Sequence, residues 1–315
     1  MNPAYSVIFF TTASGAGYGA IVWLVVLALL GIVPLTPALG ASVIIVSLAL
    51  ITAGLLSSTF HLGHPERAWR ALSQWRSSWL SREGVAALVT YVPILIFAVG
   101  SLFFSAYGPV WIWAGLIAAM LSLVTVGCTG MIYASLRAIP RWSTPLVVPL
   151  YIAFAMSTGA VLLIAIASLF WPTPGLIAWC AAVITLAAWM LKIAYWRQID
   201  NAKPVATAES ATGLGAIGTV RLLESPHSSE NYVMREMGYT IARKHAARLR
   251  KIALVVGGVA TALALVIAGL LPAPFATAAS IVALIFAAMG ILIERWLFFA
   301  EARHAASLYY GASEV

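Results

Sequence analysis

Charge is the property this sequence has least of. Only 9% of its 315 residues are Asp, Glu, Lys or Arg, whereas 62% are hydrophobic and the mean hydropathy is +0.98. A soluble domain carries about 25% charged residues. This composition excludes an ordinary soluble protein and predicts an integral membrane protein.

Cysteine and histidine are scarce as well. The two cysteines, Cys128 and Cys180, both lie inside apolar runs. That placement argues against a disulfide framework, a cysteine zinc site or an iron–sulfur cluster. None of the five histidines lies deep in an apolar run, which argues against a haem held between helices. We therefore expect no metal in this chain.

Long apolar segments make up most of the chain. A bilayer core of ~30 Å needs about 20 apolar residues per helix, and lipid requires each backbone group to be bonded internally. We predict an all-α integral membrane protein, a single domain over residues 1–315 built as an eight-transmembrane-helix bundle. The expected spans are 13–33, 40–60, 84–106, 110–136, 146–170, 175–195, 251–271 and 275–298.

The charged residues fall on one side of this arrangement. Basic residues follow the second, fourth, sixth and eighth spans, whereas the other connections carry none. The positive-inside rule assigns the charged side and both termini to the cytoplasm, here of a bacterial inner membrane. The net charge of +8 then reports topology and contact with membrane lipid, not nucleic-acid binding. The loop 201–249 is expected to dock a partner, and its "GLGAIG" lacks the βαβ context of a nucleotide site.

A polar hairpin follows the second span, in "STFHLGHPERAWRAL". Its residues 67–80 predict an interfacial helix, and Ser81 is expected to cap the next span. One interpretation is a surface hairpin with an arginine belt. The other is a quinone site, because a quinone needs an apolar slot, a donor for each carbonyl and a route for protons. His61 and Glu83, at facing helix ends, suit that chemistry.

Transport is the main alternative from another functional class. Ion-coupled carriers keep ionisable residues within their spans despite the cost. Here Lys192 and the pair Glu294–Arg295 are the nearest candidates, and they lie toward the charged ends. No Asp/Glu/His relay crosses the membrane, so a pump is disfavoured and a transporter stays a second alternative. The "GAGYG" at 15–19 is interpreted as a close-packing motif.

Four stretches in order carry a family resemblance: "HLGHPERAW" (61–69), "WLSREG" (79–84), "MIYASLRAIPRWSTP" (131–145) and "ERWLFFAEARH" (294–304). Over essentially the whole chain, the sequence resembles the membrane-anchor subunit of the dimethyl sulfoxide reductase family. The resemblance implies a metal-free anchor that holds a molybdopterin catalytic subunit and a four-cluster iron–sulfur subunit. It also implies exchange of electrons with bound quinone, either menaquinone or ubiquinone.

The same resemblance implies a set of site residues. The motif histidine, arginine and carboxylate fall on His61, Arg67 and Glu83, and Tyr133, Arg137 and Arg295 match softer positions. The cytoplasmic docking face and the long 201–249 loop resemble the sulfite dehydrogenase branch. We therefore expect sulfite oxidation with quinone reduction, with an anchor for sulfoxide or N-oxide reduction as the alternative. The anchor itself is expected to be quinone-reactive and not catalytic for the small substrate.

Overall fold

The computed structural model describes residues 2–60, 62–104, 108–173, 175–224, 229 and 241–315, the side chains of 241–244 excepted. Eight helices in it are long and apolar enough to cross a membrane, which confirms the predicted count. Seven are α1 (Tyr5–Leu29), α2 (Pro37–Thr59), α3 (Trp79–Phe103), α4 (Pro109–Ala134), α5 (Val147–Ala167), α6 (Gly175–Asp200) and α11 (Phe275–Ala300). The remaining span joins α9 (Ile241–Ala253), the π-helical segment η2 (Leu254–Ala260) and α10 (Thr261–Leu270).

The helix ends differ from the expected bounds where polar residues extend a helix beyond its apolar core. Helix α1 begins eight residues before Ala13, and α6 continues to Asp200. Helix α3 begins at Trp79 because Ser78 is its N-cap and accepts a hydrogen bond from the Ser81 N–H at 3.5 Å. The expectation that Ser81 caps this helix was wrong. Its hydroxyl instead donates to the Ala71 carbonyl and accepts from the Gln74 N–H.

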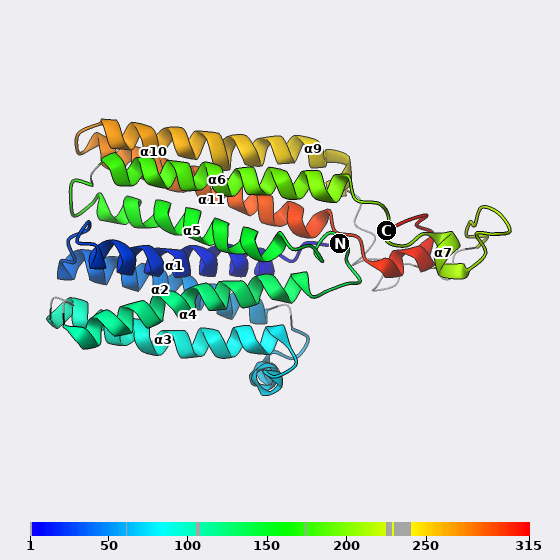
Figure 1. Ribbon diagram of the computed structural model, residues 1–315, viewed down its shortest axis with the longest axis horizontal. Coiled ribbons are helices and arrows are strands. Elements are labelled where there is room, and N and C mark those ends of the chain that lie inside the picture. Colours follow the sequence, from blue (N-terminus) through cyan, green and yellow to red (C-terminus); the bar gives the residue numbers. More distant parts are fainter. Residues whose placement is uncertain (1, 61, 105–107, 174, 225–228, 230–240) are drawn as a thin grey trace.

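The spans run side by side along the long axis of the molecule (Figure 1). Helices α1 and α5 lie at the centre, with 61% and 72% of their apolar windows buried. Helix α1 packs against α2, α4 and α5, and α5 against α4, α6 and α11. The outer helices turn large apolar side chains outward, such as Leu88, Val92 and Leu95 of α3. Such faces suit contact with lipid tails, which are as apolar as these side chains.

Glycines bring two pairs of helices into backbone contact. A Cβ at Gly19 of α1 would overlap the Ala155 carbonyl of α5, and a Cβ at Gly159 would overlap the backbone of Gly19. Close-packing by "GAGYG" is thereby confirmed. At the second crossing, Gly257 of η2 meets Gly290 of α11, so a side chain on Gly290 would strike the Gly257 backbone.

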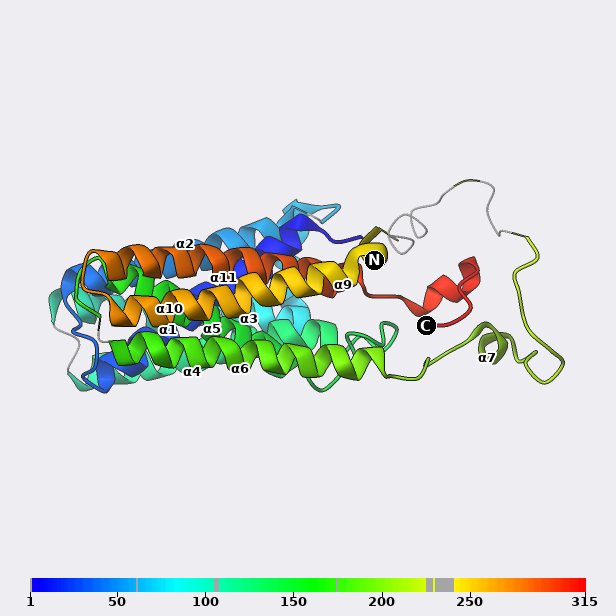
Figure 2. The same cartoon turned by 90° about the horizontal axis from the view of Figure 1, so that it is seen from above.

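One end of the bundle, here called the charged end, carries both termini (Figure 1). Beyond it lies a small cap made from residues 201–224 and 305–315, seen projecting from the bundle in Figure 2. The cap contains α7 (Ala208–Thr212), begun by a Thr207–Ser210 capping box, and the 3-10 helix η3 (Ala305–Tyr310). Its two segments are tied together by hydrogen bonds between Val315 and residues 205–206.

The hairpin between α2 and α3 also lies at the charged end. Its helical part is η1 (Pro65–Gln74), a 3-10 helix with no buried residue, in place of the expected helix over 67–80. Leu72 packs against α3 at Gly84. Arg82 of α3 donates hydrogen bonds to the carbonyls of Trp75 and Arg76, at 3.0 and 2.7 Å. These contacts fasten the hairpin to the start of α3.

Candidate functional site

Glu83 is the most unusual group near the start of α3. Its side chain is only 4% exposed, and its Oε1 has no hydrogen-bond partner among the described residues. The nearby Tyr18 of α1 is buried too, and its hydroxyl is likewise unpartnered within the described part of the chain. A buried polar atom without a partner is costly, so it is a feature of ligand sites more than of packed cores. Glu83 and Tyr18 therefore offer an acceptor or donor to a molecule that reaches this part of the bundle.

The neighbouring helices add hydroxyl groups around this pair. Tyr91, two turns further along α3, shares a 2.7 Å hydrogen bond with Thr52 of α2. Thr90 and Thr125 hydroxyls lie 3.2 Å apart between α3 and α4. The region thus combines an apolar helix wall with a few polar groups, which is the usual make-up of a small-molecule site.

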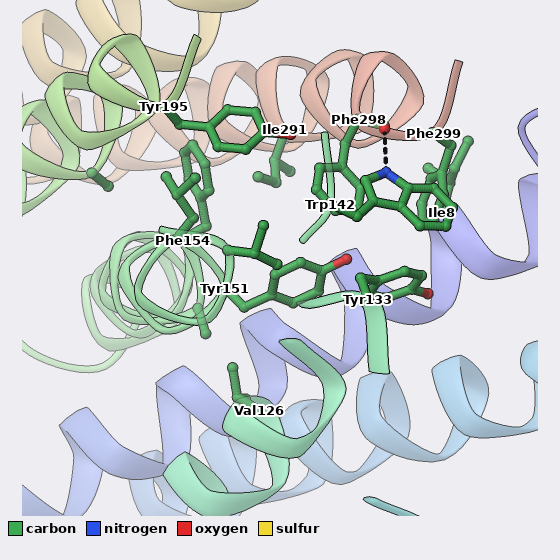
Figure 3. Close-up of a cluster of buried hydrophobic side chains, with 14 of the residues drawn as sticks. Ile8, Val126, Tyr133, Trp142, Tyr151, Phe154, Tyr195, Ile291, Phe298 and Phe299 are labelled. Atoms are coloured by element: carbon green, nitrogen blue, oxygen red, sulfur yellow. Dashed lines mark hydrogen bonds between the residues drawn. The ribbon is translucent and has the colours of Figure 1, made fainter. Parts of the chain in front are cut away.

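Tyr133 lies at the end of α4 in an aromatic cluster, shown in Figure 3. Its ring stacks on Tyr151 of α5 at a centroid distance of 5.6 Å and meets Trp142 and Phe298 edge-on at 5.3 and 5.6 Å. The indole N–H of Trp142 donates to the Phe298 carbonyl at 2.9 Å, the dashed line in Figure 3. Tyr133 is also within electrostatic range of Glu83. The cluster therefore extends from the wall of the Glu83 region toward α11.

Arg295 approaches the same cluster from α11. Its guanidinium carbon lies 3.9 Å from the centroid of the Tyr151 ring, a close cation–π contact. Its Nη1 lies 3.1 Å from Glu294 Oε2, and the other oxygen of Glu294 lies 2.5 Å from Lys192 Nζ of α6. All three side chains are at most 3% exposed. We refer to Lys192, Glu294 and Arg295 as the buried triad.

A second ionic cluster lies outside the triad, about two helical turns nearer the charged end. Glu301 of α11 pairs with Arg250 of α9 at 2.5 Å and with Arg141 at 3.2 Å, and Arg250 also pairs with Asp200 of α6 at 2.5 Å. We refer to these four residues as the rim cluster. Beside it a groove of about 430 Å³ separates the bundle from the cap. Its walls are formed by segments 140–145, 198–205 and 314–315, together with Arg303.

The structure brings together only part of the predicted site. Glu83, Tyr133 and Arg295 are buried in the bundle, and Tyr151 contacts both Tyr133 and Arg295. Arg67 lies apart on η1, where it is exposed and lies 3.7 Å from Glu66, and Arg137 is exposed after α4. His61 lies outside the described residues, so its role stays a prediction. His64 also contacts Glu66, at 3.0 Å, on the exposed hairpin.

Sequence reasoning missed several residues that the structure places here. Tyr18 was interpreted only as part of the close-packing stretch "GAGYG", Tyr151 belongs to no motif, and aromatic residues in an apolar span are ordinary. Lys192 and Glu294 had a visible signal, since each is an ionisable residue within a span. The sequence does not show that they meet, because they are 102 positions apart in the chain and on different helices.

The comparison with known families gives a clear result. The family model of the DMSO reductase anchor subunit (DmsC) matches residues 1–311. The chain belongs to this family. Family membership confirms the resemblance drawn from the four sequence stretches. It makes the chain a multi-pass membrane anchor subunit of an oxidoreductase complex, with catalytic and electron-transfer partner subunits.

A curated relative of this anchor subunit is similar over nearly its full length. It is a subunit of the sulfite dehydrogenase of Allochromatium vinosum, 33% identical over 327 aligned residues, which cover 98% of this chain and 99% of the relative. No solved structure gives a significant match to the chain. The relative agrees with the expected branch of the family.

Proposed function

We propose that this anchor subunit exchanges electrons between an iron–sulfur partner and a quinone bound near Glu83, and that the complex oxidises sulfite. The observation that carries the quinone site is the buried Glu83 carboxyl group, whose Oε1 has no hydrogen-bond partner among the described residues, near the buried Tyr18 hydroxyl. Quinone reduction takes up two electrons and two protons and forms two hydroxyl groups. The partner supplies the electrons, and Glu83 is a group that supplies or accepts a proton beside the ring.

The other predicted residues fill defined roles in this proposal. His61, expected just beyond the end of α2, hydrogen-bonds one quinone carbonyl and exchanges its proton with water. Arg67 lies on the exposed hairpin, where it suits a contact with the docked partner better than with the quinone ring. Tyr133 and Arg295 support the inner wall of the site through Tyr151.

The partner subunits are proposed to dock on the charged end. A molybdopterin subunit and a four-cluster iron–sulfur subunit fit the family, and the groove between bundle and cap offers a recess to the iron–sulfur protein. The basic connections favour the cytoplasm as the compartment of this end and of both termini, in a bacterial inner membrane. Alkaline phosphatase fused at the C-terminus is expected to be inactive, and an active fusion would overturn this orientation.

The electron direction rests on the sulfite dehydrogenase relative. The family description names a dimethyl sulfoxide reductase anchor, which favours a second candidate function, quinol oxidation coupled to sulfoxide or N-oxide reduction. The purified complex separates the two. Sulfite added with a soluble ubiquinone analogue is expected to produce quinol. A complex that forms no quinol from sulfite but oxidises quinol when dimethyl sulfoxide is added would favour the second candidate.

The site is tested with a quinone-analogue inhibitor on the same complex. Glu83→Gln preserves shape and removes the charge. For an inhibitor whose hydroxyl donates to Glu83, as a quinol hydroxyl does, we expect affinity to fall roughly tenfold, the effect of losing one charged hydrogen bond. Glu66→Gln, on the exposed hairpin, is the matched control and should bind as the wild type does. His61→Ala is expected to weaken inhibitor binding without loss of assembly. Wild-type binding in Glu83→Gln would remove Glu83 from the site.

A further inference from the structure

Two members of the buried triad, Lys192 and Glu294, have no part in the function proposed so far. Lys192 and Glu294 are completely buried, and they lie at membrane depth, where ionisable groups are expensive. A buried ion pair is weak evidence for stability, because desolvation offsets most of the attraction. Glu294 moreover serves two cations, Lys192 at 2.5 Å and Arg295 at 3.1 Å. Such an arrangement calls for a functional explanation.

Outward, the triad continues to the charged end through two aromatic residues of α6. Lys192 Nζ lies 5.3 Å from the ring of Trp196, and the guanidinium carbon of Arg250 lies at the same distance from that ring. The ring centroid of the neighbouring Tyr195 lies 4.2 Å from Lys192 Nζ. The Tyr195 hydroxyl donates a hydrogen bond to the Arg141 carbonyl at 2.8 Å. The triad and the rim cluster are therefore separated by a single layer of side chains.

Inward, the triad continues toward Glu83 through Tyr151 and Tyr133. The Tyr151 hydroxyl and the Arg295 Nε are both buried and have no hydrogen-bond partner among the described residues. Tyr151 and Arg295 border a cavity of about 10 Å³, roughly the space of one water molecule. The hydroxyl-bearing residues Thr11, Thr12, Ser14, Thr129 and Thr158 form much of its remaining wall. A water there has the polar partners it needs to bridge Arg295 of the triad to Tyr151.

We propose that Lys192 and Glu294 form a proton-exchange pair on a lateral route between the rim cluster and Glu83. This inference rests on the proposed quinone reaction, since it supplies the protons which that reaction consumes. Lys192 hands a proton to Glu294, the proton passes along bound water and the Tyr151 and Tyr133 hydroxyls to Glu83, and Lys192 is reprotonated from the charged end. When quinol is oxidised the same steps run in reverse. Arg295 keeps its charge throughout and holds the second oxygen of Glu294.

The charged and titratable groups that face the pair fit this task. They are Arg295 and Glu301 on α11, Tyr195 on α6, Tyr151 on α5, and Arg141 and Arg250 at the rim. The spans carry no Asp, Glu, Lys or Arg from this level to the uncharged end of the bundle. The route therefore begins and ends in the same half of the membrane and moves no net charge across it.

The alternative is that the pair merely fastens α6 to α11. Three variants of the full complex separate the two explanations: Lys192→Met, Lys192→Arg and, as a control, Lys251→Gln on the exposed start of the seventh span. Lys192→Met leaves Glu294 paired with Arg295. Lys192→Arg keeps a cation beside Glu294 but does not release a proton at neutral pH.

We expect quinone-linked turnover to fall roughly 100-fold in both Lys192 variants, the usual contribution of a positioned proton donor. Turnover with a soluble dye that accepts electrons directly from the iron–sulfur subunit should not change, nor should quinone-inhibitor affinity. Added methylamine, a small diffusible base, should restore part of the turnover in Lys192→Met. The Lys251→Gln control should behave as the wild type.

Wild-type quinone turnover in Lys192→Arg would show that the pair is only structural and would overturn the route. A variant that loses both quinone turnover and inhibitor binding would also overturn the route, because the loss of binding would mean that the quinone site itself is deformed. If Lys192→Met fails to assemble, Glu294→Asp and Glu294→Gln replace it, and equal turnover in these two would also refute the route. A wild-type complex that never reduces or oxidises quinone would refute the proposed function itself.

Discussion

The buried triad should respond unequally to the loss of a cation and the loss of its anion: removing Glu294 should destabilise the protein far more than removing Lys192. Lys192→Met removes one of the two cations and leaves Glu294 paired with Arg295 at 3.1 Å. Glu294→Gln instead leaves two cations facing each other in a site that is at most 3% exposed. Removing one member of a buried pair costs about 3–5 kcal/mol when the partner charge stays uncompensated. Glu294→Gln is expected to show that cost. Lys192→Met should cost less than about 1 kcal/mol, because Arg295 still compensates the charge of Glu294 and the flexible apolar methionine fills the space of the lysine.

The double variant K192M/E294Q completes the test. It leaves only Arg295, so it should be about 2 kcal/mol more stable than Glu294→Gln alone, a coupling within the range seen for residues in one network. Thermal unfolding of the detergent-solubilised complex measures these differences, at roughly 2–4 °C per kcal/mol. Glu294→Gln should therefore lower the midpoint by roughly 6–20 °C.

An exposed carboxylate provides the control for this experiment. Glu66 contacts His64 and Arg67, but all three side chains are more than half exposed, so Glu66→Gln should change the midpoint little. Equal destabilisation by Lys192→Met and Glu294→Gln, or a double variant equal to the sum of the singles, would refute the reasoning. Either result would mean that the charges are hydrated or that Arg295 does not share the carboxylate.

Three further predictions concern packing, a hydrogen bond and the cap. Gly290→Val should destabilise the bundle by about 1–3 kcal/mol through overlap with the Gly257 backbone, whereas Gly127→Ala, which meets open space, should be neutral or stabilising in the same melting assay. Trp142→Phe should cost about 1 kcal/mol by removing the donor to the Phe298 carbonyl, and an unchanged midpoint would mean that this bond adds nothing. The pKa of Glu209 is lowered by hydrogen bonds from its own backbone N–H and that of Val220. A lowered folded-state pKa means that the ionised Glu209 carboxylate stabilises the cap fully above its unfolded pKa of about 4.3, and that this stabilisation is lost as the pH falls below that value. Exchange of the Val220 amide hydrogen should therefore accelerate, relative to its intrinsic rate, below about pH 4.

The fold was largely predictable because lipid leaves the backbone few choices. Eight spans and their one-sided charges followed from hydropathy alone, and the errors lay at the ends. Helix α3 starts at Trp79 instead of 84 because Ser78, an uncharged polar residue inside an amphipathic stretch, caps it. Helix α6 gains a turn because Arg197 and Asp200 continue the helix past the lipid core. Hydropathy detects the apolar core of a helix, and capping decides where it ends.

The candidate site was predictable only in part. Glu83, Tyr133 and Arg295 were identified through family motifs, and their burial agrees with a site inside the bundle. The connection of Tyr133 to Arg295 through Tyr151 depends on lateral contacts among α4, α5 and α11, which a single sequence does not specify. Arg67 matched its motif well, yet it lies on an exposed 3-10 turn, because Pro65 directs the chain along the surface. The pairing of Lys192 with Glu294 needed the three-dimensional arrangement.

The backbone contact between Gly19 and Gly159 has a mechanical consequence. It joins the two central helices with no side chains between them that might slide or change rotamer. Carriers that alternate access rock one half of the fold against the other, and a seam of this kind resists such rocking. A stiff spine is instead suited to electron tunnelling, whose rate falls steeply with separation, because it keeps donor and acceptor at a constant spacing while the lipid around them fluctuates.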